Sequence, residues 1–501
     1  MSTALRNNSR IPLGQMALHT LLGTAFPPPA VQSFLIYGAR RTREENTHIE
    51  ELYPPEYRTD ETLYANLRFA FRHEPLDLRI IHAALEAIGP DALAEWVRAE
   101  PTGAFSRRAW FLYETFNGRT LDLEPARRGN YVPVLDEKHH FVAAPINSPR
   151  HRVRDNLLGT KDLCPTLRRT QKLEKSVAAQ LDREARALAA HYPPETLARA
   201  ASFLYTRETR SSFAIEGEAP SQNREQRFLQ ALQSIALFDS TDKQALVRLQ
   251  GQIVDPRYAA ADWRDIQNFV GETTRRFGEH VHFICPRPED VGSLMDGWMA
   301  MTRRLLTDPL DPVLTAAVTA FAFVFIHPFE DGNGRIHRFL IHYILSQRGF
   351  TPPDVIFPVS AAILRQKHQY EKTLEAFSRP IMNAIEWDFL QDSMLRVQND
   401  TRNLYRFFDA TAQAEFLYER IAETIRVDFK EELDFLEVYD AAFAAVRGIV
   451  DMPDRRASLL IRLLLQNYGR LSQSKRKQFQ ELTDDEIARM EDAIQQIIPR
   501  D

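Results

Sequence analysis

One stretch near the middle of the chain constrains the fold more than any other. Residues 313–326 form an apolar run without a single charged side chain, and residues 339–345 form a second run that is mainly apolar. The polar, glycine-rich segment 327–338 joins the two runs. Because the first run is shorter than the ~20 apolar residues that span a bilayer, we expect two buried helices in a globular core, with the polar loop between them.

The joining segment combines glycines and arginines in an order that suits a phosphate. Gly332 and Gly334 let the backbone adopt positive φ and bring N–H groups close to a ligand. A helix that starts near Asn333 has unpaired N–H groups and a positive dipole end, which together attract anions. Arg335 and Arg338 are three residues apart, so their guanidinium groups lie on neighbouring positions of that helix. Guanidinium groups match phosphate oxygens, and the segment therefore predicts a polyphosphate site.

Two further side chains of the segment indicate what happens to that phosphate. Asp331 is a hard oxygen ligand of the kind that Mg²⁺ takes alongside substrate phosphates. His327 can be neutral near pH 7 and can accept the proton of an incoming hydroxyl group. No G-x-x-x-x-G-K-[ST] sequence occurs in the chain, so the segment is not a Walker loop. The combination predicts phosphoryl or nucleotidyl transfer, because an ordinary helix–turn–helix corner needs neither paired arginines nor a histidine.

The complete pattern, H-x-F-x-D-G-N-G-R-x-x-R over residues 327–338, resembles the signature of the Fic family, H-x-F-x-[DE]-G-N-G-R-x-x-R, with no position missing. The resemblance covers the middle of the chain, from about residue 200 to about residue 385. It implies a Fic-like helical core that binds ATP through residues 332–338 and Mg²⁺ through Asp331. In this resemblance His327 is the base that deprotonates a target hydroxyl group. Asn333 and the backbone donors around it would stabilise charge on the α-phosphate.

A second motif of the same family precedes the first. Residues 203–217 have helical periodicity, and Gly217 marks the end of the expected helix. Ser212 and Glu216 lie four residues apart, on one face of it. Ser212-x-x-x-Glu216-Gly217 resembles the [ST]-x-x-x-E-[GN] inhibitory motif of Fic proteins that carry the inhibitory helix in the same chain, before the core. The resemblance implies that Glu216 pairs with Arg338 in place of the γ-phosphate of ATP and holds activity down.

The same resemblance implies a β-hairpin flap and an adenine pocket. The flap strand would contact the nucleotide and could pair with an extended target segment by strand addition; it corresponds to Val281, His282, Phe283 and Ile284. Cys285 follows, where the family often has proline. Tyr370 lies on a segment that resembles the helix lining the adenine pocket and is the candidate for stacking on the base. Ser378 stands where the family commonly has asparagine.

Composition and charge are those of a soluble globular protein. The chain is 44% hydrophobic and 26% charged, and its net charge of −5 gives no sign of a general nucleic-acid or membrane surface. The two cysteines, Cys164 and Cys285, cannot form a disulfide framework. Residues 1–10 are polar and lack the apolar segment of a signal peptide. We therefore expect a cytoplasmic protein.

The flanks carry no catalytic constellation. The 501 residues are enough for roughly three domains, and helical spacing recurs both from residue 62 to residue 116 and after residue 386. Substrate recognition or self-association is the use that we expect of these flanks. The expected organisation is an all-α N-terminal domain (1–125), a small hairpin of residues 130–135 with 139–144 followed by a linker (126–170), the catalytic core with its inhibitory helix 203–217 (171–385) and a helical C-terminal domain (386–501).

The sequence therefore predicts a mainly α protein with a Fic-like helical core, a small β-hairpin flap and helical flanks. Its expected activity is transfer of AMP from ATP to a Ser, Thr or Tyr hydroxyl group of a target protein or of the chain itself. Three alternatives stay open. Glu216 could orient water for the reverse removal of AMP, the donor could be another nucleoside triphosphate, or the chain could be a non-catalytic adaptor that senses nucleotide. The intact His327 argues against the adaptor, because a sensor has no use for a base.

Overall fold

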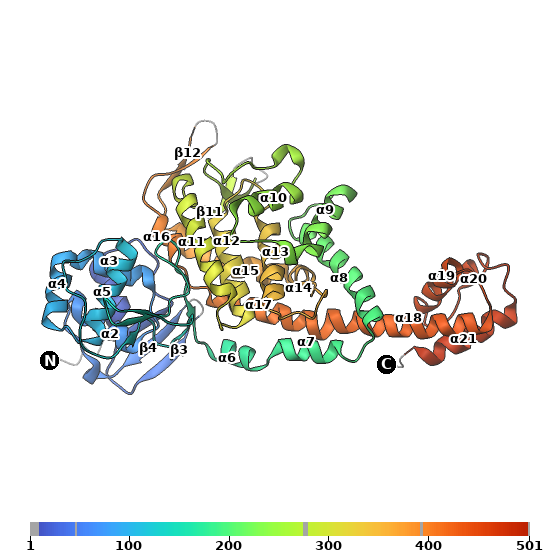
Figure 1. The fold of residues 1–501 in the computed structure, drawn as a ribbon, viewed down its shortest axis with the longest axis horizontal. Helices are drawn as coiled ribbons and strands as arrows, with labels where there is room; N and C mark the ends of the chain where they lie inside the picture. The colour runs from blue at the N-terminus through green and yellow to red at the C-terminus, as the bar shows by residue number, and fades with distance from the viewer. Residues whose placement is uncertain (1–9, 46–47, 274–278, 391–393, 499–501) are drawn as a thin grey trace, which may run out of the picture. The chain divides into compact units, whose positions relative to one another are not determined.

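The computed structural model describes residues 10–45, 48–273, 279–390 and 394–498 (Figure 1). The chain divides into two compact units. The first consists of Met1–Gln180, Thr209–Phe350 and Ser360–Arg420, and the second of Leu181–Glu208, Thr351–Val359 and Ile421–Asp501. Helices dominate both units, which confirms the mainly α class.

A four-stranded sheet opens the first unit. Its strand order is β1–β2–β4–β3, in which β2 and β4 are parallel and the other neighbours are antiparallel. Along β2, Val31, Ser33 and Leu35 are buried and the residues between them are half-buried, which is the period of a strand. The expectation of an all-α N-terminal domain is therefore wrong for residues 11–53, because such short strands carry too little periodicity to be recognised. The elements are β1 (Ile11–Leu13), α1 (Gly14–Leu22), β2 (Val31–Leu35), β3 (Arg41–Glu44) and β4 (Ile49–Tyr53).

The helices that the spacing predicts follow this sheet. Thr62 and Asp77 cap the first two, since their side chains accept hydrogen bonds from the backbone N–H groups of Ala65 and Arg79. Their apolar faces meet around Trp110, which is fully buried. This part of the N-terminal prediction is confirmed. The helices are α2 (Leu63–His73), α3 (Leu78–Ile88), α4 (Pro90–Ala99) and α5 (Ala104–Asn117).

The two runs predicted to form a hairpin do not pair with each other. The first pairs with a later strand in parallel, and the second pairs with a still later strand. The buried side chain of Asn156 binds both the N–H and the C=O group of Leu135, at 2.9 and 3.0 Å, and so ties the first run to the segment read as a linker. The hairpin prediction is wrong for this reason. The strands are β5 (Val132–Pro133), β6 (His140–Phe141), β7 (Ile146–Ser148), β8 (Val153–Asp155) and β9 (Leu167–Arg168).

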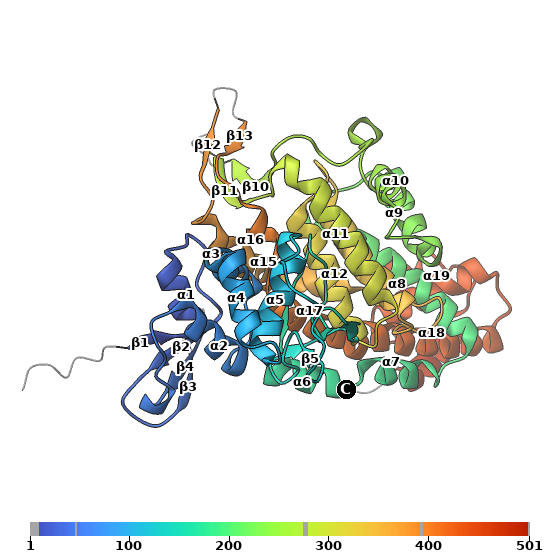
Figure 2. The ribbon, with the colours of Figure 1, turned by 60° about the vertical axis from the view of Figure 1, so that its left-hand side comes forward.

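Three helices form the centre of the first unit, and α12 packs against both α11 and α13 (Figure 2). Every side chain of residues 313–326 is buried, and α13 is buried over most of its length, as the two apolar runs predict. In the sequence, the antiparallel hairpin of β10 and β11 precedes these helices, which confirms the predicted hairpin. The elements are α9 (Gln222–Gln233), α10 (Lys243–Ile253), β10 (Phe269–Thr273), β11 (Glu279–Ile284), α11 (Pro288–Leu306), α12 (Pro312–Ile326), α13 (Asn333–Gln347) and α15 (Lys367–Met382).

A second hairpin follows the centre of the unit, so the expectation of a helical C-terminal domain from residue 386 onward is wrong for its first strands. It consists of β12 (Trp387–Phe389) and β13 (Leu395–Val397), in antiparallel pairing. The ring of Phe389 lies 5.9 Å from that of Phe269 on β10, so this hairpin contacts the flap. The short helix α16 (Arg402–Arg406) comes next.

The second unit is helical, as the sequence predicts for the C-terminal region. The side chains of Val446, Leu460 and Met490 are fully buried in its core. Helix α8 (Pro194–Ile215) begins in this unit, and its residues from Thr209 onward belong to the first. No helix in the described part of the chain is long and apolar enough to cross a membrane. The other helices are α7 (Leu181–Ala189), α18 (Lys430–Ile449), α19 (Asp454–Leu465), α20 (Gln473–Arg476) and α21 (Asp484–Ile497).

Candidate active site

His327 stands at the C-terminal end of α12 in a left-handed conformation, with φ of 52°. Its Nδ1 lies 3.2 Å from the carbonyl oxygen of Val324. Because a carbonyl can only accept, Nδ1 carries the proton and Nε2 keeps a lone pair that can take another. Burial, assisted by the positive charge of Arg264, lowers the pKa of His327 to about 4. The imidazole is therefore neutral near pH 7, as a general base must be.

Three side chains from earlier in the chain hold the loop after His327 through its carbonyl groups. The buried Arg264 donates from Nε to the carbonyl oxygen of His327 at 2.8 Å, and its backbone N–H donates to that of Pro328 at 2.9 Å. Asn268 donates to the carbonyl oxygen of Glu330 at 3.2 Å. Gln250 donates to that of Asp331 at 3.3 Å. Sequence reasoning missed all three residues, since each acts on backbone some sixty to eighty positions away.

The side chain of Asn333 closes the same loop from inside. Its Nδ2 donates to the carbonyl oxygen of Phe329 at 2.7 Å, and its Oδ1 accepts from the N–H of Phe329 at 3.0 Å. The side chain of Asn333 is 1% exposed and both of its polar ends are thus engaged. Asn333 thus shapes the loop. Because an amide nitrogen has two N–H groups and this bond uses one, the expectation that Asn333 and the backbone donors around it stabilise charge on a phosphate stays a prediction.

Helix α13 begins directly after this loop and presents its N-terminus. Gly332, at the N-cap, has φ of 90° and offers no side chain that could cap the first N–H groups. Those groups, from Asn333 onward, have no partner within the helix, as the predicted anion site requires. A Cβ atom on Gly334 would lie 2.2 Å from Oε1 of Glu216, so only glycine admits that carboxylate here.

Asp331 lies at the mouth of the site. Its Oδ1 accepts hydrogen bonds from the N–H of Gly332 at 2.5 Å and from Nη2 of Arg335 at 2.8 Å, and about half of its side chain, 52%, is exposed. In the described part of the chain no three His, Cys, Asp or Glu side chains gather into a metal site. A single exposed carboxylate suits a Mg²⁺ ion whose other ligands are substrate phosphates and water.

Arg338 is enclosed by the end of helix α8. Its Nε donates to Oγ of Ser212 and its Nη2 to the carbonyl oxygen of the same residue, both at 2.8 Å. Nη2 also donates to Oε1 of Glu216 at 2.7 Å, so the predicted pair is present. Arg338 is 1% exposed and Glu216 35% exposed. Although burial opposes ionisation, the charge of Arg338 lowers the pKa of Glu216 below its ordinary value.

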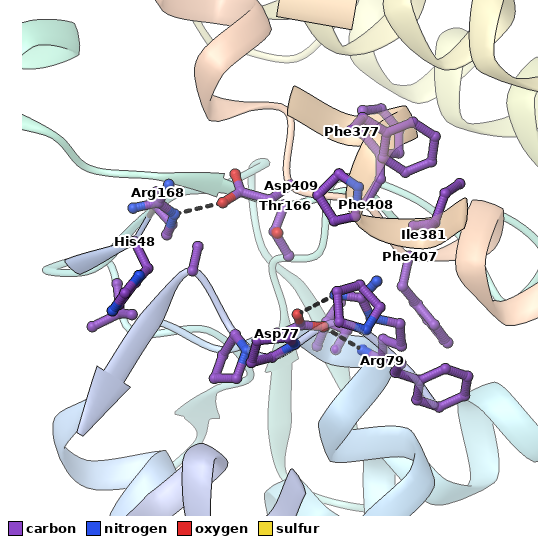
Figure 3. Close-up of a pocket in the computed structure, with 18 of the residues that line it drawn as sticks. His48, Asp77, Arg79, Thr166, Arg168, Phe377, Ile381, Phe407, Phe408 and Asp409 are labelled. Carbon is purple, nitrogen blue, oxygen red and sulfur yellow. Dashed lines mark hydrogen bonds and ion pairs between the residues drawn. The ribbon is translucent and has the colours of Figure 1, made fainter. Parts of the chain in front are cut away.

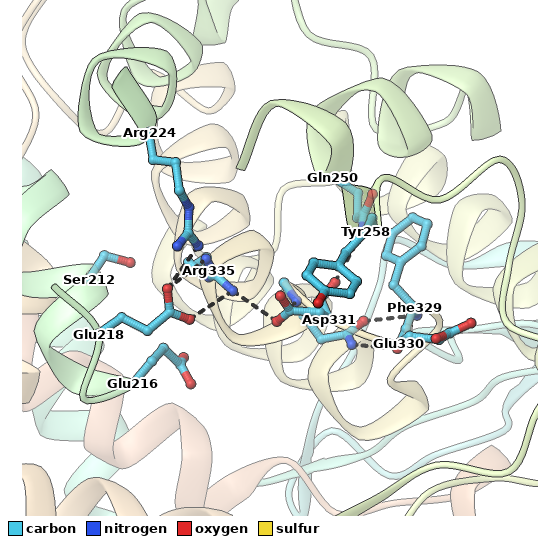
Figure 4. A network of polar contacts seen from close by, with 12 residues as sticks. Ser212, Glu216, Glu218, Arg224, Gln250, Tyr258, Phe329, Glu330, Asp331 and Arg335 are labelled. Atoms are coloured by element: carbon cyan, nitrogen blue, oxygen red, sulfur yellow. Dashed lines mark hydrogen bonds and ion pairs between the residues drawn. The ribbon is translucent and has the colours of Figure 1, made fainter. Parts of the chain in front are cut away.

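Arg335, the other arginine of the segment, lies between two carboxylates (Figure 4). One is Asp331, and the other is Glu218, whose Oε1 lies 3.2 Å from Nη2 of Arg335. Glu218 also accepts a hydrogen bond at 2.8 Å from Nη2 of Arg224 on α9. Sequence reasoning passed over both Glu218 and Arg224. The available signal was a second acidic residue, Glu218, directly after Gly217.

The predicted adenine-binding residues are buried. Tyr370 on α15 is 5% exposed, and its ring lies 6.2 Å from that of His337 and 5.8 Å from that of Phe416. Its hydroxyl group interacts with Arg338, and burial raises its pKa to about 12. Tyr370 thus contacts Arg338 through its hydroxyl group, and its stacking on adenine stays a prediction. Ser378, also on α15, is 5% exposed.

The flap residues divide into two kinds. Phe283 and Ile284 are buried, and the hydroxyl group of Tyr405 donates to the carbonyl oxygen of Ile284 at 2.5 Å. These two residues anchor the flap, and their assignment to nucleotide binding stays a prediction. Val281 is half-buried and His282 exposed, so these two can face a ligand. Among the described strands only β10 pairs with β11, and strand addition by a target stays a prediction.

A cavity of about 590 Å³ lies elsewhere in the first unit (Figure 3). Its lining includes none of the predicted site residues. Its charged side chains are paired with each other, Arg79 with Asp77 at 2.7 Å and Arg168 with Asp409 at 2.5 Å. This cavity is therefore no part of the predicted site.

Comparison with known proteins places this loop inside a known domain. Residues 240–345 match the sequence model of the Fic/DOC family. A curated relative, "Protein adenylyltransferase Fic" of Drosophila willistoni, is 26% identical over 248 residues, which cover 45% of this chain and 47% of that protein. The protein of the same name from Nematostella vectensis is 36% identical over 120 residues, 23% of each chain. The chain thus spans about half the length of the first relative and less of the second.

Two solved structures are also similar. A Fic family protein from Desulfovibrio desulfuricans G20 matches with 18% sequence identity and a TM-score of 0.38, over 60% of this chain and 88% of that one. The structure of Fic-1, residues 134–508, from C. elegans matches with 21% identity and a TM-score of 0.30, over 42% of this chain and 67% of that one.

Proposed function

Because residues 240–345 of this chain are a Fic domain, we propose that the protein is a protein adenylyltransferase, which transfers AMP from Mg²⁺-bound ATP to a Ser, Thr or Tyr hydroxyl group. The observation that carries the proposal is a neutral His327, with Nε2 able to accept a proton, at the mouth of a helix N-terminus flanked by Arg335 and Arg338. The relatives named adenylyltransferases support it.

In this proposal the first turn of α13 holds the phosphates. The N–H groups from Asn333 onward point along the helix axis toward the loop, and the positive dipole end favours anions. Arg335 and Arg338 add guanidinium groups that are already desolvated, so they need no further loss of water to bind phosphate. Asp331 would hold Mg²⁺, which would neutralise part of the charge of the phosphates.

The transfer step follows from the position of His327. Nε2 takes the proton of the target hydroxyl group while its oxygen attacks the α-phosphorus of ATP. The bond from the α-phosphorus to the oxygen that links it to the β-phosphorus breaks, and pyrophosphate leaves. The N–H groups at the start of α13 stabilise the charge that develops on the α-phosphate. Arg264 and Asn268 contribute indirectly, because they hold the carbonyl groups of the loop that carries the base.

Glu216 would keep this activity low in the isolated protein. Its carboxylate occupies Nη2 of Arg338, where the γ-phosphate is proposed to bind, and Gly334 lets it approach the start of α13. The target segment would pair with β11 next to Val281 and His282, and the chain itself could serve as a target. Removal of AMP by water that Glu216 orients is the second candidate. It is favoured by the electrostatic interaction of Glu216 with His327.

Label transfer tests the proposal. The purified protein is incubated with Mg²⁺ and α-labelled ATP as wild type, Glu216→Gly and His327→Ala, and label on protein is measured. We expect weak labelling of the wild type, strong labelling of Glu216→Gly and none of His327→Ala. Equal labelling of all three proteins would refute the mechanism. Loss of AMP from a pre-modified target only when Glu216 is present would favour the reverse reaction.

A further inference from the structure

Glu218, a carboxylate outside the inhibitory motif, faces the second arginine of the site. Its Oε1 lies 3.2 Å from Nη2 of Arg335 and its Oε2 lies 3.4 Å from Nη1. Both oxygens thus face both terminal nitrogens, in the arrangement that carboxylates and guanidinium groups prefer. Arg335 is only 2% exposed, so its charge depends on neighbouring carboxylates for compensation. Asp331 pairs with Arg335 as well, and Glu216 also interacts with it electrostatically.

The turn at the end of α8 explains how two glutamates reach two arginines. Gly217 has φ of 72°, and the N–H groups of Gly217 and Glu218 donate to the carbonyl oxygens of Ala214 and Phe213, at 3.0 and 3.1 Å. These are the bonds of a Schellman turn, which reverses the chain just after Glu216. Glu216 and Glu218 therefore flank one glycine. On α13 the two arginines are three residues apart and lie on neighbouring positions of one face.

Arg224 holds Glu218 in this position. Its Nη2 donates to Oε2 of Glu218 at 2.8 Å, and its guanidinium carbon lies 5.3 Å from the centre of the Phe213 ring. The guanidinium carbon of Arg335 lies at the same distance, 5.3 Å, from that ring. Phe213 is fully buried, so both arginines stack on a fixed surface. Figure 4 shows Glu218 between the two arginines.

We propose that Glu218 is a second inhibitory carboxylate, which occupies Arg335 as Glu216 occupies Arg338. The inference rests on the proposed function, because it takes these two arginines to be ligands of the ATP phosphates. A triphosphate that enters the site must displace both carboxylates. Replacing either Glu216 or Glu218 leaves the other carboxylate in place, so each single substitution relieves the inhibition of ATP binding only in part.

Binding of Mg²⁺-bound ATP tests this proposal without any need for transfer. The Kd is measured by titration calorimetry for the full chain as wild type, Glu216→Gln, Glu218→Gln and the double variant. Glu218→Gln should bind about three- to tenfold more tightly than the wild type, as the loss of a partly exposed competing ion pair predicts. The double variant should bind more tightly than either single one. Inorganic tripolyphosphate, which lacks the base and ribose, should follow the same order.

Glu225→Gln is the matched control. Glu225 lies on α9, pairs with Arg210 at 2.6 Å and makes the same change of net charge when replaced by glutamine. We expect its Kd to equal that of the wild type. If Glu218→Gln binds no more tightly than this control, the proposal is wrong. Weaker binding by Glu218→Gln would also overturn it, because Glu218 would then orient Arg335 for phosphate.

The two proposals fail separately in this design. Tighter binding by Glu218→Gln, with no label transferred by any variant, supports Glu218 as a second inhibitory carboxylate and refutes adenylyl transfer. Strong label transfer by Glu216→Gln, together with an unchanged Kd for Glu218→Gln, supports adenylyl transfer and refutes the inhibitory role of Glu218.

Discussion

Replacing Glu216 by glutamine removes the charge of the inhibitory side chain and keeps its shape. The carboxylate accepts a hydrogen bond of 2.7 Å from Arg338, whose side chain is 1% exposed, while Glu216 itself is 35% exposed. A hydrogen bond between charged groups contributes about 1.5–3 kcal/mol when buried. Since a third of Glu216 reaches water, screening reduces the contribution to about 1–2 kcal/mol.

The same free energy sets how strongly nucleotide binding is suppressed. If the closed pair is favoured by about 1–2 kcal/mol, the open state that phosphate requires is populated at roughly 3–15%, and the apparent Kd rises by the inverse of that fraction. We therefore expect Glu216→Gln to tighten binding of Mg²⁺-bound ATP by about five- to thirtyfold. The nucleotide-free variant should also unfold at a lower temperature than the wild type, because a buried arginine has lost its countercharge.

Titration calorimetry and thermal unfolding of the full chain measure the two effects together. Ser212→Ala is the matched control, since Oγ of Ser212 accepts from Nε of Arg338 at 2.8 Å but carries no charge that competes with phosphate. It should lower the unfolding temperature without tightening ATP binding. The reasoning is refuted if Glu216→Gln is destabilised but binds ATP no more tightly, or if Ser212→Ala tightens binding equally.

Three further perturbations follow from the geometry. Because burial lowers the pKa of His327 from 6.5 to about 4, kcat/KM of transfer should show no inflection near pH 6.5 and should fall only near pH 4. The same shift affects stability: the neutral imidazole stabilises the fold above pH 6.5, and this contribution is lost as pH falls from 6.5 to 4. Asn333→Asp loses the 2.7 Å bond to the carbonyl oxygen of Phe329 and should destabilise the fold by about 1–3 kcal/mol, measured by chemical denaturation. Gly334→Ala places a Cβ 2.2 Å from Glu216 Oε1 and should displace that carboxylate without tightening ATP binding, measured by calorimetry, because the same methyl group crowds the phosphate site.

The centre of the site was predictable because its information is local. An apolar run, a polar loop with glycines and a second apolar run define α12, the His327 loop and α13 within one short segment. The pair of Glu216 and Arg338 spans 122 positions, yet the resemblance of both ends to family motifs was enough to predict it. Periodicity alone also placed the helices α2 to α5 correctly.

The errors arise where distant backbone decides the outcome. The strands of residues 11–53 are three to five residues long, so their period-two pattern was too short to separate from the helical spacing that follows. Asn156 binds Leu135 across 21 positions and thereby redirects the strand that was expected in a hairpin. Composition carries no record of such contacts.

The site contacts that were missed have the same cause. Arg264 and Asn268 act on carbonyl groups of the loop, and backbone partners leave no pattern in the side chains of a single sequence. Tyr370 was assigned to adenine by its place in a resembling segment, which did not indicate that its hydroxyl group interacts with Arg338. Glu218 has no position in the family motif, and only the turn at Gly217 brings it to Arg335.

The burial of the two arginines links inhibition to stability. Arg335 and Arg338 are 2% and 1% exposed, and a guanidinium group so far from water is costly unless an anion is near it. In the nucleotide-free protein Glu216 and Glu218 supply that negative charge, so the contacts proposed to block ATP also stabilise the empty site. A variant without these carboxylates should therefore be less stable when empty and should gain more from ATP. The shift in unfolding temperature on adding Mg²⁺-bound ATP should accordingly be larger for Glu216→Gln than for the wild type.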